Sequence, residues 1–394
     1  MALQDLSQII LDNPTGVFYP GQLITGKFEL VLKEEKTITA INFISKGQAK
    51  CHWTEGGGQN TRYYYGNEKY FHFKQCLFGK QQSGESSVKF KPGKYEYPFK
   101  VQLPINIPAS FEAVIGHVRY SLKAHIDIPW ARDKYCKKLI TIVVPLDLNT
   151  IPNVTEGATN TGEKRLCCLC CESDPISGMI AIDRKGYVPG EMIIVRGEIN
   201  NQSNREMTCT KVCLQMEVTY HATMKSKPFK QTIGELKHGK LNGGETEIFN
   251  NERLHIPPVP NSYLHDCKII DIKYLVEIIA DPSGLGFDLE VPVEIVIGSV
   301  PLTSVAEQHG LSLSTQEPMS VSLPQPGNNI HGLYSDLSMP TNIPTATMTE
   351  SATGRVKIKE GKDSKDTVEY APVYTYYNWN THDTDTLFSV QKEK

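Results

Sequence analysis

The sequence lacks the features that direct a chain into a membrane or onto nucleic acid. No apolar run approaches the roughly 18 residues that a membrane-spanning helix needs. The 41 basic and 44 acidic side chains leave a net charge of −3, so no long-range field attracts nucleic acid. The first residues carry no basic stretch ahead of an apolar one, which argues against a secretory signal. We therefore expect a cytoplasmic protein that binds no nucleic acid.

Amphipathic helices and catalytic signatures are also missing. No capping residue precedes a sustained apolar stripe at helical spacing. The sequence contains no HExxH, no GxSxG and no phosphate-binding loop. Its histidines at positions 52, 117, 125 and 221 are scattered over predicted strands rather than grouped. These absences predict that the protein is not an enzyme and needs no cofactor or metal.

Alternation of apolar and polar residues dominates the first 300 positions. Clear examples are the stretches 41–53, 118–128, 212–220 and 287–297. A period of two is typical of antiparallel strands with one buried face. The pattern predicts an all-β fold.

Two short segments occur twice along the chain, in the same order. Residues 18–24 match residues 187–193, each with an aromatic residue followed by a Pro-Gly turn that leads into a strand. Residues 118–122 match residues 272–276 in the same way. The repeats predict two tandem β-sandwiches of immunoglobulin-like type, made by duplication.

The composition divides the chain into four parts. We expect an N-domain over residues 1–150, an interdomain linker over 151–175 and a C-domain over 176–300. Residues 301–394 are rich in Ser, Thr, Pro and Asn with little alternation. Such a composition cannot bury enough apolar area to offset the entropy of ordering it, so we expect a disordered C-terminal tail.

A cysteine cluster lies in the expected linker. It holds four of the ten cysteines: Cys167, Cys168, Cys170 and Cys171. A zinc site would need a second pair, and the candidates Cys209 and Cys213 would lie roughly 13 Å apart along one strand. Two interpretations remain open. The cysteines, which follow Lys164 and Arg165, are lipidated in an exposed linker, or they pack between the domains.

Several short motifs follow one another in a specific order. They are Tyr19-Pro20-Gly21, GQAKCHWTE at 47–55, GHVRY at 116–120, DRKGYVPGE at 183–191 and LEVPV at 289–293. Together they resemble the arrestin domain-containing proteins, the α-arrestins, over roughly residues 8–302. The resemblance implies two arrestin-like β-sandwiches joined by a short linker. It also implies an adaptor that brings membrane receptors or transporters to a HECT-type ubiquitin ligase for endocytic and endosomal sorting.

The tail holds an incomplete version of the motif by which such adaptors bind the ligase. Family members use Pro-Pro-x-Tyr, whereas this chain has Ala371-Pro372-Val373-Tyr374. A WW domain seats two prolines of a polyproline II segment in an aromatic groove. The alanine removes one packed ring, so we expect weaker binding.

A second tail motif fits a different partner. Tyr334 and Leu337 have the spacing of the Tyr-x-x-hydrophobic signal that clathrin adaptors bind as an extended strand. The leading hypothesis is therefore a cytoplasmic adaptor that associates peripherally with the plasma membrane and endosomes. Its partners would be membrane-protein cargo, a WW-domain ligase and a clathrin adaptor. The alternative is a trafficking scaffold of retromer-subunit type that needs no ligase.

Overall fold

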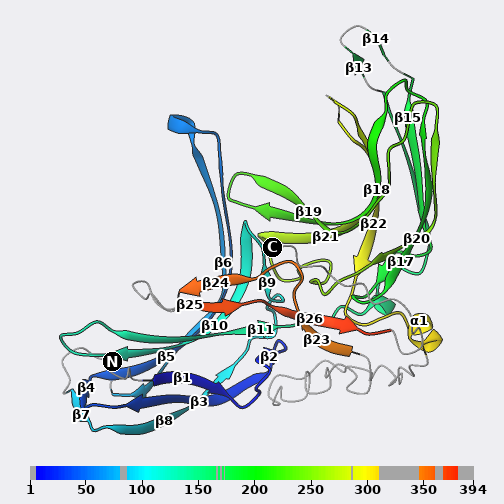
Figure 1. Cartoon of the computed structure of the whole chain (residues 1–394). Helices are drawn as coiled ribbons and strands as arrows, with labels where there is room; N and C mark the ends of the chain where they lie inside the picture. The colour runs from blue at the N-terminus through cyan, green and yellow to red at the C-terminus, as the bar shows by residue number, and fades with distance from the viewer. Residues whose placement is uncertain are drawn as a thin grey trace.

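The computed structural model of the chain describes residues 6–79, 87–165, 167–168, 171–172, 174–284, 287–309, 346–359 and 367–379. These residues form two β-sandwiches, and strands from the end of the chain lie between them (Figure 1). No helix of the described part is long and apolar enough to cross a membrane. The predicted all-β fold with two tandem sandwiches is confirmed.

The N-domain contains eleven of the described strands. They are β1 (Leu6–Leu11), β2 (Val17–Phe18), β3 (Leu23–Leu32), β4 (Lys36–Ile38), β5 (Ala40–Glu55), β6 (Arg62–Phe78), β7 (Val88–Phe90), β8 (Gly93–Gln102), β9 (Phe111–Glu112), β10 (Gly116–Asp127) and β11 (Lys134–Ile142), with a 3-10 turn at Gly58–Asn60. One sheet has the order β1-β3-β8 and the other β2-β11-β10-β5-β6. Phe43 of the second sheet stacks on Phe99 of the first, with ring centroids 4.0 Å apart, so the core lies between the two sheets.

The C-domain repeats this arrangement with one strand more at the edge of its first sheet. Its strands are β12 (Ala158–Lys164), β13 (Cys167–Cys168), β14 (Cys171–Glu172), β15 (Ile176–Ile182), β16 (Gly186–Tyr187), β17 (Met192–Asn201), β18 (Met207–His221), β19 (Ser226–Lys237), β20 (Thr246–His255), β21 (Ile270–Pro282) and β22 (Leu289–Ile297). The sheets have the orders β12-β15-β17-β20 and β16-β22-β21-β18-β19. A 3-10 turn at Leu148–Thr150 lies on the connection between the domains.

The alternating rows of the sequence are the buried faces of these strands. In β10 every second residue from Val118 to Ile126 is buried, and the residues between them are partly exposed. Phe287 differs from the prediction, because 83% of its surface is exposed. The reason is that β22 begins two residues later, at Leu289, which is buried.

The Pro-Gly turn has the same hydrogen bonds in both sandwiches. The amide of Gly21 donates to the carbonyl of Pro104 at 3.0 Å, and the amide of Gly190 donates to the carbonyl of Ile256 at 2.8 Å. In each copy the turn leads into an inner strand of the smaller sheet, β3 or β17. The duplication inferred from the sequence therefore extends to individual bonds.

The repeated tyrosine has the same role in both copies. The hydroxyl of Tyr120 donates to the carbonyl of Pro108 at 2.6 Å, and the hydroxyl of Tyr274 donates to the carbonyl of Pro260 at 2.7 Å. Both rings are fully buried. Each bond ties a loop that crosses the end of the sandwich to the central strand beneath it.

The sequence suggested that the cysteine cluster lies at the joint between the domains. The structure places it elsewhere. Strand β12 falls in the expected linker, but it pairs with β15 from Ala158 opposite Ile182 to Lys164 opposite Ile176. The cysteines follow β12 and form the hairpin β13–β14 at the far end of the C-domain (Figure 1). The polar composition of β12 concealed this strand, because an edge strand with few apolar residues shows little alternation.

Parts of the expected tail are ordered against the two domains. They form helix α1 (Thr303–Gln308) and the strands β23 (Ala346–Glu350), β24 (Val356–Lys359), β25 (Thr367–Tyr370) and β26 (Val373–Tyr377). Strand β23 pairs with β26, and β24 pairs with β25. We call residues 346–359 and 367–379 the docked tail. For these residues the expectation of disorder is corrected, because the apolar surface that covers them comes from the domains.

The repeated tyrosine gives a test of the duplication. We expect Tyr120→Phe and Tyr274→Phe each to lower the free energy of unfolding by about 1 to 2 kcal/mol, because each leaves a buried carbonyl without its donor. Urea unfolding of the two variants measures this loss. Tyr63→Phe is the matched control, since 61% of the Tyr63 surface is exposed. A variant at position 120 or 274 that unfolds like the control would contradict the equivalence of the two copies.

Candidate functional site

The segment Ala371–Tyr374, predicted from the sequence to be an incomplete ligase motif, lies inside the docked tail. Pro372 falls in the break between β25 and β26, where its missing N–H costs no ladder hydrogen bond. Its carbonyl accepts a bond from the amide of Ser351 at 2.8 Å. Pro372 and Tyr374 are buried, whereas Ala371 and Val373 are partly exposed. The motif is therefore part of a packed β-structure.

Two tyrosines of the docked tail bind the N-domain. The hydroxyl of Tyr370 donates to the carbonyl of Ile140 at 3.2 Å, and the hydroxyl of Tyr374 donates to the carbonyl of Ser110 at 3.1 Å. Burial raises the pKa of both phenols, so both remain protonated donors at neutral pH. Strand β25 lies along β11, the strand that contains Ile140 (Figure 1).

A third tyrosine, Tyr377, binds the C-domain. Its hydroxyl donates to the carbonyl of Ser299 at 2.7 Å, and its amide donates to the carbonyl of Pro189 at 3.0 Å. Gly190 has φ +101°, and a Cβ atom there would lie 1.9 Å from the carbonyl oxygen of Tyr377. The repeated Pro-Gly turn of the second sandwich is thus also a place where the tail packs closely against the backbone, and a side chain larger than glycine would not fit there.

Tyr377 is also part of an apolar cluster beneath the connection between the domains. The cluster unites the interdomain turn, the C-domain, helix α1 and the tail through the buried residues Leu148, Val154, Val188, Val296, Leu302, Val305, Ala306 and Tyr377. The Tyr377 ring stacks on Trp379 with centroids 5.2 Å apart. We call the surface that receives the docked tail the interdomain seam, defined by Ser110, Ile140, Pro189 and Ser299.

A second feature is a basic hollow on the N-domain. Its volume is about 480 Å³. It is lined by residues of β5, β6, β10 and the segment before β10, namely Lys46, Gln48, Lys50, Cys51, His52, Tyr65, Gly66, Asn67, Lys69, Ile115 and His117. The lining contains three lysines and two histidines but no carboxylate.

Strand register brings these cations together. Lys50 of β5 lies opposite His117 of β10 on one side and opposite Asn67 of β6 on the other. Gln48 lies opposite Lys69. The sequence showed these positions only as polar faces of separate strands, and it could not supply the pairing that groups them.

The charges in the basic hollow repel one another. The pKa of Lys46 is lowered first by burial and then by the charges of Lys50 and Lys69. The pKa of His117 is lowered to about 3, first by burial and then by the positive charges of Arg119 and Lys50. This ring is therefore neutral at physiological pH. None of the three lysines forms an ion pair with another residue that the structure describes. A bound anion would relieve the repulsion, which makes the hollow suited to acidic ligands.

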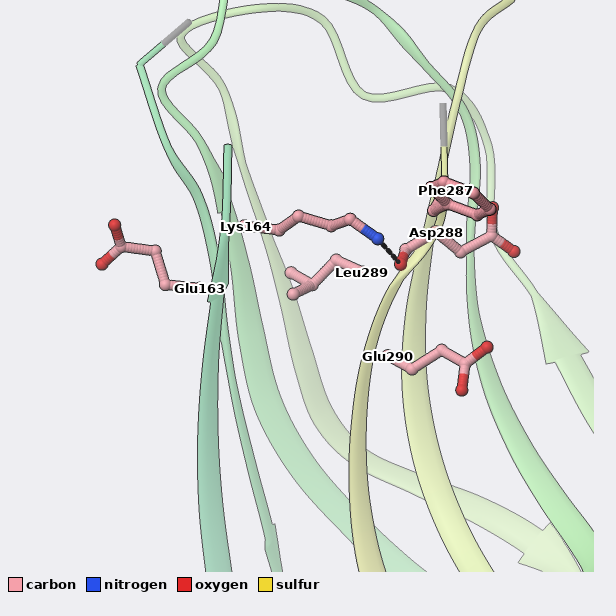
Figure 2. Close-up of a pocket in the computed structure, with 6 residues that line it drawn as sticks. All are labelled: Glu163, Lys164, Phe287, Asp288, Leu289 and Glu290. Carbon is pink, nitrogen blue, oxygen red and sulfur yellow. Dashed lines mark hydrogen bonds between the residues drawn. The ribbon is translucent and has the colours of Figure 1, made fainter. Parts of the chain in front are cut away.

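A third feature, an open hollow of about 690 Å³, lies at the far end of the C-domain, next to the cysteine hairpin. It is lined by Glu163, Lys164, Phe287, Asp288, Leu289 and Glu290. Figure 2 shows Lys164 reaching toward the carbonyl of Asp288, to which its Nζ donates at 2.8 Å, while Glu163 points away from the other side chains. The Lys164 ammonium lies 5.3 Å from the ring centroid of the exposed Phe287.

The residues predicted from the sequence are not gathered in one place. Cys167, Cys168 and Cys171 belong to the hairpin at the far end of the C-domain, and Cys170 lies outside the described residues. The Ala371–Tyr374 motif lies in the interdomain seam. Tyr334 and Leu337 of the expected sorting signal also lie outside the described residues.

Comparison with known proteins agrees with this architecture. The family model described as the N-terminal domain of arrestin (or S-antigen) matches residues 7–149, and the model of its C-terminal domain matches residues 172–302. The chain is 32% identical to arrestin domain-containing protein 17 of Caenorhabditis elegans over 337 residues, which is 82% of this chain and 77% of that protein.

More distant similarities extend to mammals. Arrestin domain-containing protein 4 of Mus musculus is 28% identical over 81% of this chain and 77% of its own length. Human thioredoxin-interacting protein is 26% identical over 74% of each chain. The chain therefore belongs to the arrestin domain-containing, or α-arrestin, family. This membership supports an arrestin-like adaptor role, which is carried out by binding surfaces.

Proposed function

We propose that the protein is an adaptor that binds cytosolic segments of membrane receptors or transporters and directs their endocytic and endosomal sorting. The observation that carries this proposal is the basic hollow. Three lysines that have no acidic partner among the described residues face an open space on a protein whose net charge is −3. The charge is thus concentrated locally, as recognition of an acidic segment requires.

The cargo segment would be rich in Asp, Glu or phosphorylated residues. Such a segment supplies the carboxylates or phosphates that Lys46, Lys50 and Lys69 lack within the described chain. Gln48 and Asn67 would add neutral hydrogen bonds along its backbone. Among the strands that the structure describes, none lies beside β6 at this edge of the sheet, which leaves room for an extended peptide.

The tail would supply the sorting partners. We propose that Ala371-Pro372-Val373-Tyr374 is a weak ligand for a WW-domain ubiquitin ligase and that Tyr334 with Leu337 binds a clathrin adaptor. The support for the first is the proline-to-tyrosine spacing, and for the second the Tyr-x-x-hydrophobic pattern. Action at the cytoplasmic face of the plasma membrane and endosomes belongs to the same proposal.

One observation favours the alternative of a ligase-independent trafficking scaffold. Pro372 and Tyr374 are buried in the interdomain seam, so this form of the protein presents no free ligase motif. In the scaffold alternative, the docked tail is a permanent part of the fold. The two functions therefore differ in whether the tail leaves the seam.

Charge removal in the basic hollow tests the cargo site. An exposed ion pair contributes up to about 1 kcal/mol, so the triple variant Lys46→Gln, Lys50→Gln, Lys69→Gln should bind an acidic peptide about tenfold or more weakly. Fluorescence titration with a peptide rich in Asp and Glu, at two salt concentrations, measures the effect. The wild-type affinity should fall with added salt.

The matched control removes the same charge elsewhere, through Lys27→Gln, Lys89→Gln and Lys240→Gln. These lysines are exposed and lie outside the hollow. The control should bind as the wild type does. Equal binding by the two triple variants would reject the basic hollow as the cargo site.

We also propose that the cysteine hairpin is lipidated and attaches the far end of the C-domain to membranes. The support is its position at a tip beside the exposed Phe287 and the basic residues Lys164 and Arg165. Acyl-exchange labelling of the protein from cells should give a signal that disappears when Cys167, Cys168, Cys170 and Cys171 are changed to serine. An unchanged signal in that variant would reject the site.

A further inference from the structure

We propose that the interdomain seam masks the ligase motif, so that the motif binds a WW domain only after the docked tail has left the seam. The inference rests on the proposed function for the identity of the partner. It goes beyond that function by assigning a regulated state to the motif. The interdomain seam and the WW domain compete for the same two side chains of the docked tail, Pro372 and Tyr374.

The two side chains that a WW domain reads are the ones that the seam covers. A WW domain packs the proline ring and the tyrosine into neighbouring pockets of one exposed groove. In the structure Pro372 is buried, and only 7% of the Tyr374 surface is accessible. The Tyr374 hydroxyl is already bonded to the carbonyl of Ser110. No groove on another protein can reach these groups while the tail is docked.

The backbone of the motif is also engaged. Val373 and Tyr374 belong to β26 and pair with Glu350 and Thr349 of β23. A WW ligand needs the motif as a polyproline II segment, which has no internal hydrogen bonds and presents its faces to the groove. The same residues cannot be a paired strand and a free polyproline II helix at once.

Contacts on both sides of the motif hold the tail in place. Beyond the motif, Tyr377 bonds to Ser299 and Pro189. In residues 346–359, the other part of the docked tail, Gly354 lies against the N-domain, where a Cβ atom would be 2.3 Å from the carbonyl oxygen of Glu112. Changes at Tyr377 or Gly354 can therefore release the tail without altering any residue of the motif.

The expected effect follows from the population of the undocked state. When a ligand binds only that state, the apparent dissociation constant is the intrinsic value divided by the undocked fraction. Truncation of a buried aromatic side chain such as Tyr377 typically removes enough packing energy to weaken docking by about a hundredfold or more. Release variants should thus recover most of the affinity of a free peptide.

The test uses a reporter that does not depend on the native motif being a good ligand. Ala371→Pro in the full chain creates two consecutive prolines before Val373 and Tyr374. Position 371 lies between β25 and β26, outside both ladders, and the preceding Tyr370 is at the end of an extended strand, which a following proline favours. Binding of a purified WW domain from a HECT-type ligase is then titrated against the full-length reporter and a reporter peptide of residues 367–379.

Three further proteins complete the experiment in the reporter background. Tyr377→Ala and Gly354→Ala are the release variants. The first removes a large aromatic side chain, and the second adds a single methyl group. Tyr63→Ala is the matched control, because Tyr63 is an exposed tyrosine of β6. Circular dichroism of each protein verifies that both sandwiches remain folded.

The full-length reporter should bind at least about tenfold more weakly than the peptide, and both release variants should bind within about threefold of the peptide. The Tyr63→Ala control should match the full-length reporter. Equal affinity of the full-length reporter and the peptide would overturn the inference, as would folded release variants that stay as weak as the reporter. The same titration with native Ala371 tests the proposed ligase partner separately: a native peptide that does not bind would reject that partner and leave the reporter result intact.

Discussion

The hydroxyl groups of Tyr374 and Tyr377 connect the end of the chain to both sandwiches. Tyr374 donates to the carbonyl of Ser110 in the N-domain, and Tyr377 donates to the carbonyl of Ser299 at the end of the C-domain. Buried phenols and buried carbonyls each need a partner, so these bonds satisfy groups that neither domain satisfies alone. The connection of the two domains and the accessibility of the proposed ligase motif therefore depend on the same contacts.

The surfaces proposed to bind partners lie on separate elements of the fold. The basic hollow belongs to the larger sheet of the N-domain, the cysteine hairpin extends the C-domain, and the motif belongs to the docked tail. This separation fits the proposed adaptor, which would hold cargo, membrane and a sorting partner at the same time. Described residues of the two domains cover the motif, so release of the docked tail would change what a partner can bind.

The fold could be predicted because its signals are local. Alternation of apolar and polar residues identified the rows of buried side chains. The recurrence of Gly21 at Gly190 and of Tyr120 at Tyr274 indicated the duplication, and in the structure each pair makes equivalent hydrogen bonds. Three features could not be recognised from a local stretch of sequence. The edge strand β12 is polar, the hollow depends on cross-strand register, and the tail tyrosines are buried by distant surfaces. A composition typical of disorder does not reveal apolar surface that other segments provide.

The central claim is that the end of the chain is bound in the interdomain seam. Hydrogen–deuterium exchange of the full-length protein, resolved by mass spectrometry over residues 367–379, tests it most directly. The account predicts strong protection of this segment, including the Tyr377 amide that donates to Pro189, relative to the same residues in a free peptide. Exchange of the segment in the full-length protein at the rate of the free peptide would contradict it.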